Sequence, residues 1–208
     1  VDFLVELTEA TTGQRRGEVV EWLRGDGREM MLRMEALPSM RLLAMAGEPV
    51  RRQNLALFNC SYVSVDAPQA WVEMLIISMS GCGVGFSVER KYIDKLPSVA
   101  TQTGRCVDHV VDDSTDGWAE ALRLGLQSWF VDGVDVRYDF SQVRPAGAPL
   151  KTKGGRASGP DPLRLMLLAI RSIILSRQGQ RLRDTDAHTI SCHVGQAAVQ
   201  GGMRRTAM

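Results

Sequence analysis

The hydrophobic and polar positions along the chain change their period several times, and these changes predict its elements. In residues 17–23 and 28–37, apolar side chains recur at spacings of three and four, which is typical of helices, and Pro38 ends the second run. We therefore expect a small helical segment over residues 1–50. One larger domain should follow over residues 51–208.

The larger domain begins with a pattern typical of a buried β-α-β unit. Residues 57–65 have the aromatic and β-branched content of a strand, and residues 69–80 predict a helix that is apolar on nearly all sides. Residues 81–88 form a glycine-rich entry into a second buried strand.

Residues 89–140 carry more charge, and we interpret them as an insertion between strands. Within them, an amphipathic helix is expected from about Thr115 to Phe130, with Asp113 or Ser114 as its cap.

The rest of the chain predicts helices over residues 160–177 and about 185–199, the second ending at Gly201-Gly202. A further strand is expected near Thr206. Alternating strands and helices place the chain in the α/β class.

The segment from Arg144 to Pro162 has the composition of a phosphate-binding loop. Gly154 and Gly155 let the backbone approach a ligand closely, and Ser158 precedes a helix whose free N–H groups attract anions. Four basic side chains add positive charge: Arg144, Lys151, Lys153 and Arg156. The segment has no Gly-Lys-Ser/Thr signature, so a solvated basic loop is the alternative.

Overall charge and cysteine content limit the classes of function. The chain has 25 Lys plus Arg against 24 Asp plus Glu, so we expect no broad nucleic-acid or membrane surface. Four cysteines without a CxxC pair fit a reducing compartment, and we expect the cytoplasm. The spacing of His188, Cys192 and His193 suits a shared helical face poorly, so we expect no metal site there.

Five motifs in order resemble one enzyme family. They are Asn59-Cys-Ser-Tyr62, Gly81-Cys-Gly-Val-Gly-Phe-Ser87, Asp113-Ser-Thr-Asp-Gly-Trp118, the segment from Arg144 to Pro160, and Gln200-Gly-Gly-Met-Arg-Arg-Thr-Ala207. Together they resemble adenosylcobalamin-dependent, class II ribonucleotide reductases, particularly the monomeric ribonucleoside-triphosphate type. The resemblance runs from about residue 36 to the C-terminus.

The resemblance implies a fold and a reaction. The chain would be the first part of a ten-stranded α/β barrel, preceded by the small helical segment and carrying an inserted helical effector-site subdomain at 89–140. In this family a thiyl radical, made with the cobalamin, abstracts a ribose hydrogen so that the 2′-hydroxyl of the ribonucleotide can leave. Two other cysteines supply the electrons, and a thioredoxin-type reductant restores them.

Cys60 matches the first cysteine of the reducing pair, although a cysteine in a strand is more commonly a small buried hydrophobe. Asn59, Cys82 and Gly83 match positions close to the substrate, with Cys82 as lining and not as a redox group. Cys106 and Cys192 are expected to be packing residues.

The resemblance also implies an allosteric site for a deoxynucleoside triphosphate. Arg144 and Lys151 match positions that hold effector phosphates. Asp113 and Ser114 fall in the insertion that completes the effector pocket in monomeric members, and a plain helix cap is the alternative. Gln200 and Arg204 match the loop between the effector and substrate sites, and a simple helix end is the alternative there.

Much of the family pattern is missing, including the radical cysteine, the second reducing cysteine, the catalytic Asn and Glu and most cobalamin contacts. We therefore expect a partial chain, or one piece of a split enzyme, that needs the remaining C-terminal part to turn over. The alternatives are a nucleotide-binding regulatory module without catalysis and a fragment of a diiron, class I reductase.

Overall fold

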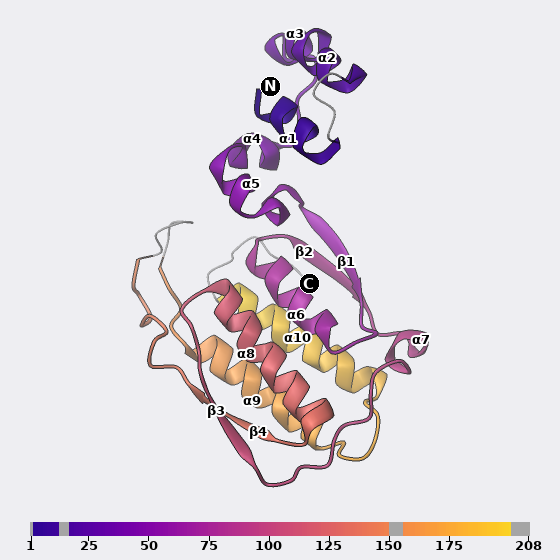
Figure 1. The fold of residues 1–208 in the computed structure, drawn as a ribbon, viewed down its shortest axis with the longest axis vertical. Helices are drawn as coiled ribbons and strands as arrows, with labels where there is room; N and C mark the ends of the chain where they lie inside the picture. The colour runs from indigo at the N-terminus through magenta and orange to yellow at the C-terminus, as the bar shows by residue number, and fades with distance from the viewer. Residues whose placement is uncertain (1, 13–16, 150–155, 201–208) are drawn as a thin grey trace. The chain divides into compact units, whose positions relative to one another are not determined.

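The computed structural model describes residues 2–12, 17–149 and 156–200 and divides the chain into two compact units (Figure 1). The first unit is Val1–Phe58 and the second is Asn59–Met208. The division falls after Phe58, whereas the sequence pattern placed it near residue 50. Each unit is described separately below.

The first unit is helical, as its apolar spacing predicted. Its small core consists of Val5, Val20 and Leu23, with Leu4 and Met31 packed against them. Its elements are α1 (Asp2–Thr12), α2 (Glu18–Arg24), α3 (Asp26–Leu32), α4 (Met40–Met45), α5 (Glu48–Arg52) and a 3-10 turn (Asn54–Leu57).

The second unit opens with the predicted β-α-β arrangement, which the structure confirms. Strand β1 (Cys60–Ser64) leads into α6 (Gln69–Met79) and then into β2 (Gly83–Ser87), and β1 and β2 pair in parallel. Helix α6 has the buried faces expected of its apolar sequence. A short helix, α7 (Arg90–Ile93), follows β2.

A second β-α-β arrangement fills most of the charged segment that we interpreted as a helical insertion. Strand β3 (Cys106–Val110), helix α8 (Thr115–Gln127), a π-helical turn (Ser128–Asp132) and strand β4 (Asp135–Asp139) follow one another, and β3 pairs with β4 in parallel. The predicted helix is present as α8, but the expectation of a helical subdomain did not include the two strands beside it. Charged side chains such as Asp108 and Arg137, which form an exposed ion pair across the two strands, hid the strand pattern.

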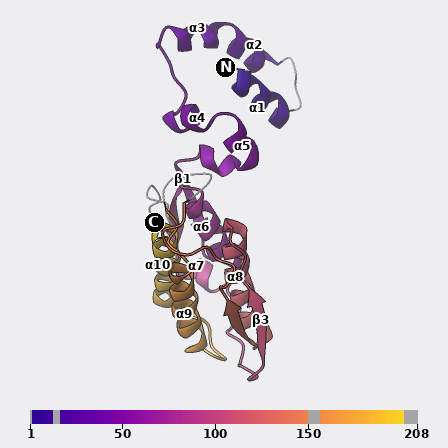
Figure 2. The same ribbon diagram turned by 90° about the vertical axis from the view of Figure 1, so that its left-hand side faces the viewer.

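Four helices form the core of the second unit. Helix α6 packs against α8 and α10 (Asp184–Gln200), and α9 (Asp161–Leu175) packs against α8 and α10. Figures 1 and 2 show these helices side by side, with β1 and β2 beside α6 and with β3 and β4 beside α8. The part of the chain that the structure describes has two sheets of two strands each. No helix in that part is both long and apolar enough to cross a bilayer.

The Asp186 side chain stabilises the turn between α9 and α10. Its carboxylate accepts hydrogen bonds from the backbone N–H of Arg183 at 3.0 Å and from the side chains of Arg177 and Arg183. Burial opposes ionisation, but these hydrogen bonds outweigh it and lower the pKa of Asp186 to about 2.

We expect Asp186→Asn to lower the free energy of unfolding by about 2 kcal/mol at neutral pH. A lowered pKa in the folded state stabilises the fold above the ordinary value of 3.8, and this contribution is lost as the pH falls from there through about 2. The difference between variant and parent should therefore shrink in acid, as urea unfolding at several pH values would show. Asp184→Asn removes a carboxylate two residues away and is the matched control, and an equal loss in both variants would contradict the role of Asp186.

Candidate functional site

Cys60 lies on the open face of the β1–β2 sheet. Side chains alternate along a strand, so Cys60 and Tyr62 share one face while Val63, which is buried, lies on the other. The Cys60 thiol is free and exposed. The alternative of a buried, hydrophobe-like cysteine is therefore wrong in this structure.

Two glycines flank this face on the neighbouring strand. The parallel register pairs Cys60 with Gly83 and Tyr62 with Gly85, so no side chain on β2 covers the strand beside them. The Gly83 N–H donates to the Asn59 carbonyl at 2.8 Å, and the Ser61 hydroxyl donates to the Gly83 carbonyl at 3.1 Å. These hydrogen bonds hold the backbone of Gly83 next to the exposed Cys60 thiol. Because Gly83 has no side chain, a ligand can approach both the backbone and the thiol.

The other three cysteines are placed differently from Cys60. Cys82 precedes β2 and its side chain is 1% exposed, so it does not open onto the face that carries Cys60. Cys106 and Cys192 are exposed, and the expectation that they are packing residues was wrong. Cys106 begins β3, most of which is exposed, and Cys192 lies on the outer side of α10, with its sulfur 3.7 Å from Nδ1 of His188.

A second cluster lies where β3 and β4 end. The carboxyl ends of parallel strands meet at one edge of a sheet, and the segments that leave them carry Asp113 and Arg144. The Nε–H of Arg144 donates to Oδ2 of Asp113 at 2.7 Å, and about a third of each side chain is exposed. The fold thus joins two predicted effector residues that stand 31 positions apart.

Ser114 caps helix α8, which confirms one of the two caps that the sequence suggested. Its hydroxyl accepts from the Gly117 N–H at 2.9 Å and donates to Oδ2 of Asp112 at 2.6 Å. Gly117 is required here, because a Cβ would lie 2.4 Å from the backbone oxygen of Asp112. The start of α8 is surrounded by three aspartates, Asp112, Asp113 and Asp116. Their carboxylates accept hydrogen bonds and repel a phosphate that would contact them directly.

The predicted phosphate loop has well-defined flanks. The Gly147 N–H donates to the Ala157 carbonyl at 2.9 Å, and the Ala157 N–H donates to the Ala148 carbonyl at 2.8 Å. Gly159 has a φ of 77°, and a Cβ there would lie 2.9 Å from the backbone nitrogen of Ala146. The two segments on either side of the loop are therefore hydrogen-bonded to each other, a few residues after Arg144.

Several predicted residues lie outside the described part of the chain. Lys151, Lys153, Gly154 and Gly155 are among them, as are Gly201-Gly202, Arg204 and the strand expected near Thr206. Gln200 is described as the exposed last residue of α10. Within the described residues, no group of three or more His, Cys, Asp or Glu side chains is arranged to hold a metal ion.

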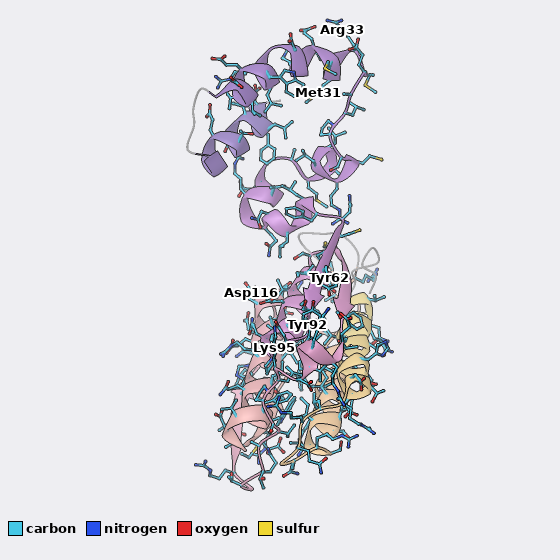
Figure 3. The ribbon with its side chains drawn as sticks, turned by 90° about the vertical axis from the view of Figure 1, so that its right-hand side faces the viewer. Met31, Arg33, Tyr62, Tyr92, Lys95 and Asp116 are labelled. Carbon is cyan, nitrogen blue, oxygen red and sulfur yellow. The ribbon has the colours of Figure 1, made fainter. Side chains whose placement is uncertain are left out.

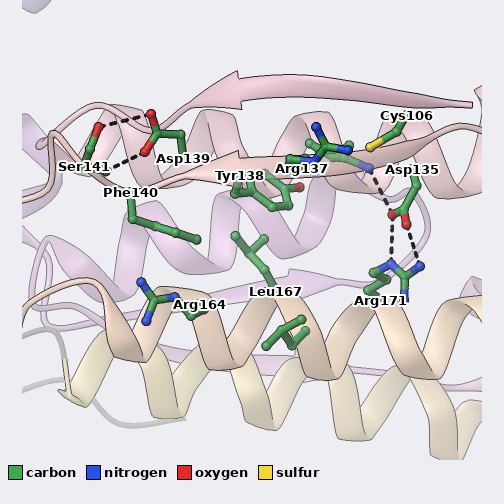
Figure 4. Close-up of a pocket in the computed structure, with 12 residues that line it drawn as sticks. Cys106, Asp135, Arg137, Tyr138, Asp139, Phe140, Ser141, Arg164, Leu167 and Arg171 are labelled. Atoms are coloured by element: carbon green, nitrogen blue, oxygen red, sulfur yellow. Dashed lines mark hydrogen bonds and ion pairs between the residues drawn. The ribbon is translucent and has the colours of Figure 1, made fainter.

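The sequence patterns did not indicate a cavity of about 860 Å³ between β4 and α9 (Figure 4). Tyr138, Phe140 and Leu167 line it, and at one end Arg171 donates two hydrogen bonds to Asp135. Arg164 lies over the Phe140 ring at 5.0 Å. A third arginine, Arg137, also lines the cavity, and each of the three forms an ion pair with an aspartate.

Comparison with known proteins identifies the relatives of the chain. No family model matches it. The adenosylcobalamin-dependent ribonucleoside-triphosphate reductase of Euglena gracilis is 32% identical, over 84% of this chain and 25% of the relative. The reductase of the same description from Lacticaseibacillus paracasei is 28% identical, over 91% of this chain and 34% of the relative. The chain is related to the adenosylcobalamin-dependent ribonucleotide reductases.

The fold agrees with this relationship. A crystal structure of a B12-dependent, class II ribonucleotide reductase matches 95% of this chain and 36% of its own with a TM-score of 0.78, at 23% identity. The chain spans about a quarter to a third of the length of the reductases that it matches.

Proposed function

We propose that this chain is part of a class II ribonucleotide reductase that converts ribonucleotides into 2′-deoxyribonucleotides for DNA synthesis. The observation that carries the proposal is the exposed Cys60 thiol beside the bare backbone of Gly83, at the position where the family has a reducing cysteine. In the same proposal β1 and β2 are adjacent strands of a ten-stranded barrel. This arrangement is supported by their parallel register and by the packing of α6 against both of them.

Cys60 would serve as one half of a dithiol. When two thiols form one disulfide they release two electrons and two protons, which balances the reduction of a ribonucleotide with loss of its 2′-hydroxyl as water. Cys82 is buried and is not suited to be the partner of Cys60, so we propose that the second cysteine belongs to the remaining part of the reductase. A thioredoxin-type reductant would then reduce the disulfide, and a reducing compartment such as the cytoplasm suits this cycle.

Adenosylcobalamin enters the proposal through the relatives, whose names state the dependence. When bound, it supplies the radical that begins the reaction. The described residues place a thiol and bare backbone on one face, which fits the reductant role. We assign no cobalamin contact to them.

The proposal is tested with the complete reductase that contains this chain, supplied with a ribonucleoside triphosphate, a dithiol and adenosylcobalamin. Formation of deoxyribonucleotide only with the cobalamin supports the assignment. Formation without it would point to a class I reductase. Nucleotide binding without any reduction would favour a regulatory module.

We further propose that the ends of β3 and β4 form part of a deoxynucleoside-triphosphate effector site. Arg144 would hold a phosphate together with Lys151, which the sequence places in the same loop. Asp113 and Ser114 carry oxygens that accept hydrogen bonds, so they suit a sugar hydroxyl or a base. Gln200 and Arg204 would connect this site with the substrate.

We expect Arg144→Ala to weaken binding of the effector by about 1.5–3 kcal/mol, the scale of a hydrogen bond to a charged group. Loss of its partly exposed ion pair with Asp113 should cost less than about 1 kcal/mol of folding stability. Calorimetric titration of the complete reductase measures the affinity. Arg123→Ala is the control, because Arg123 also forms an ion pair, with Glu120, but both residues lie within α8 and not at the strand ends. Equal affinities for the two variants would exclude Arg144 as a phosphate ligand.

A further inference from the structure

Tyr62 is the large side chain nearest to Cys60 on the open face of β1. It stands two residues further along the strand, which is roughly 7 Å, and it is 61% exposed. Its neighbours Val63 and Val65 are buried on the other face. The exposed ring offers a flat apolar surface beside a free thiol, and aromatic side chains commonly line ligand sites.

The strand beside Tyr62 leaves its ring uncovered. Gly85 is its partner in the register, and a Cβ built on Gly85 would lie 3.8 Å from Cδ2 of Tyr62. The ring therefore leans toward β2 across a position that has no side chain. Together, Cys60, Gly83, Gly85 and Tyr62 form a surface with a thiol at one end, bare backbone in the middle and an aromatic ring at the other end.

Hydroxyl groups lie near the phenol end of Tyr62. Those of Ser64 and Ser87, and to a smaller extent that of Tyr92, lower the pKa of Tyr62. Ser64 and Ser87 end the two strands, so the phenol end of the side chain faces the carboxyl ends of the sheet, away from Cys60. The ring itself stays open to a ligand.

Tyr92 is itself held in place (Figure 3). The ammonium groups of Lys91 and Lys95 lie 4.9 and 5.6 Å from the centre of its ring. Lys91 also pairs with Glu89 at 3.1 Å, and Glu89 accepts from the Ser87 hydroxyl at 3.1 Å. Charged side chains of the segment after β2 thus surround Tyr92, whose hydroxyl contributes to the lowered pKa of Tyr62.

We propose that Tyr62 positions the substrate for Cys60, with its ring supporting the nucleobase while the ribose lies over Gly83. The inference rests on the proposed reductase function and adds a residue to its substrate site. Stacking on a tyrosine ring tolerates every base, because each base has a flat π face. Tyr62 would therefore contribute to the affinity for all substrates, and residues other than Tyr62 would select among the bases.

The test compares Tyr62→Ala and Tyr62→Phe in the complete reductase by steady-state kinetics. Tyr62→Ala should raise KM for each ribonucleotide about tenfold while kcat changes less than about threefold, since the ring binds but does not react. Tyr62→Phe keeps the ring and should stay close to the parent. Val131→Ala, an exposed position outside both sites, is the control and should leave both constants unchanged. An unchanged KM in Tyr62→Ala would overturn the proposal.

A second measurement does not depend on the folding of a variant. Tetranitromethane nitrates exposed tyrosines, and peptide mass mapping reports the extent of nitration at Tyr62 in the parent reductase. A ribonucleotide should slow nitration of Tyr62, and equal rates with and without it would overturn the proposal. Normal turnover of Cys60→Ser combined with protection of Tyr62 would uphold the role of Tyr62 and refute that of Cys60, so the two failures are distinguishable.

Discussion

Cys60→Ser in the complete reductase should abolish multiple turnovers with a dithiol reductant. Serine keeps the size of the side chain but cannot form a disulfide, so the two electrons that the reaction needs are not delivered. Substrate binding should remain close to that of the parent, because the backbone of Gly83 and Asn59 keeps its hydrogen bond. The measurement is deoxyribonucleotide formed per enzyme, together with nucleotide affinity.

The chain offers two matched controls for this variant. Cys106 and Cys192 are also free and exposed, but Cys106 lies on β3 and Cys192 on α10. Cys106→Ser and Cys192→Ser should therefore keep normal turnover. If Cys60→Ser also turned over normally, Cys60 would not belong to the reducing pair.

Trp71→Ala should cause the largest loss of stability, about 3–5 kcal/mol. The Trp71 side chain has no exposed surface, stacks on Phe130 at 6.2 Å between ring centres, and donates from Nε1 to the Ser191 hydroxyl at 3.1 Å. The substitution leaves a large cavity among α6, the turn after α8 and α10, and it removes the partner of a buried hydroxyl. Urea unfolding of the chain would measure the loss.

Two further variants show whether the position and the ring account for the effect. Trp71→Phe also loses the hydrogen bond to Ser191, but it retains most of the packing and should cost clearly less because it leaves a smaller cavity. Leu165 on α9 is 62% exposed, so Leu165→Ala should change stability by no more than about 0.5 kcal/mol. A loss in Trp71→Ala as small as that in Leu165→Ala would contradict the placement of Trp71 in the core.

The elements with the strongest apolar patterns were predictable from the sequence. Helix α6 is apolar on nearly all sides because it packs against β1, β2, α8 and α10, and its flanking strands were visible from β-branched residues and glycines. Strands β3 and β4 were not visible in the same way. Most of β3 is exposed, so no apolar alternation marks it. Strand β4 alternates, with Val136 and Tyr138 between charged residues, but it has only five residues and lies in a charged segment.

The exposure of the cysteines was also not predictable from the sequence pattern. A cysteine at random is commonly buried, and that expectation failed for Cys106 and Cys192 because β3 and the outer side of α10 lie at the surface. The motif around Cys60 indicated a functional thiol. Its exposure on a face flanked by Gly83 and Gly85 depends on the register of β1 with β2, which the spacing of residues did not provide.

By itself the sequence determined the family resemblance, the α/β class, the first β-α-β unit and the identity of the candidate residues, because these depend on local composition and on order along the chain. Only the tertiary structure decided which residues meet. The ion pair between Asp113 and Arg144 forms because two parallel strands end at one edge of a sheet, and Tyr62 adjoins Cys60 over bare backbone because the register places glycines opposite both. Contacts between distant residues arise from strand pairing and helix packing, and these are set by the burial of the whole core rather than by any one segment.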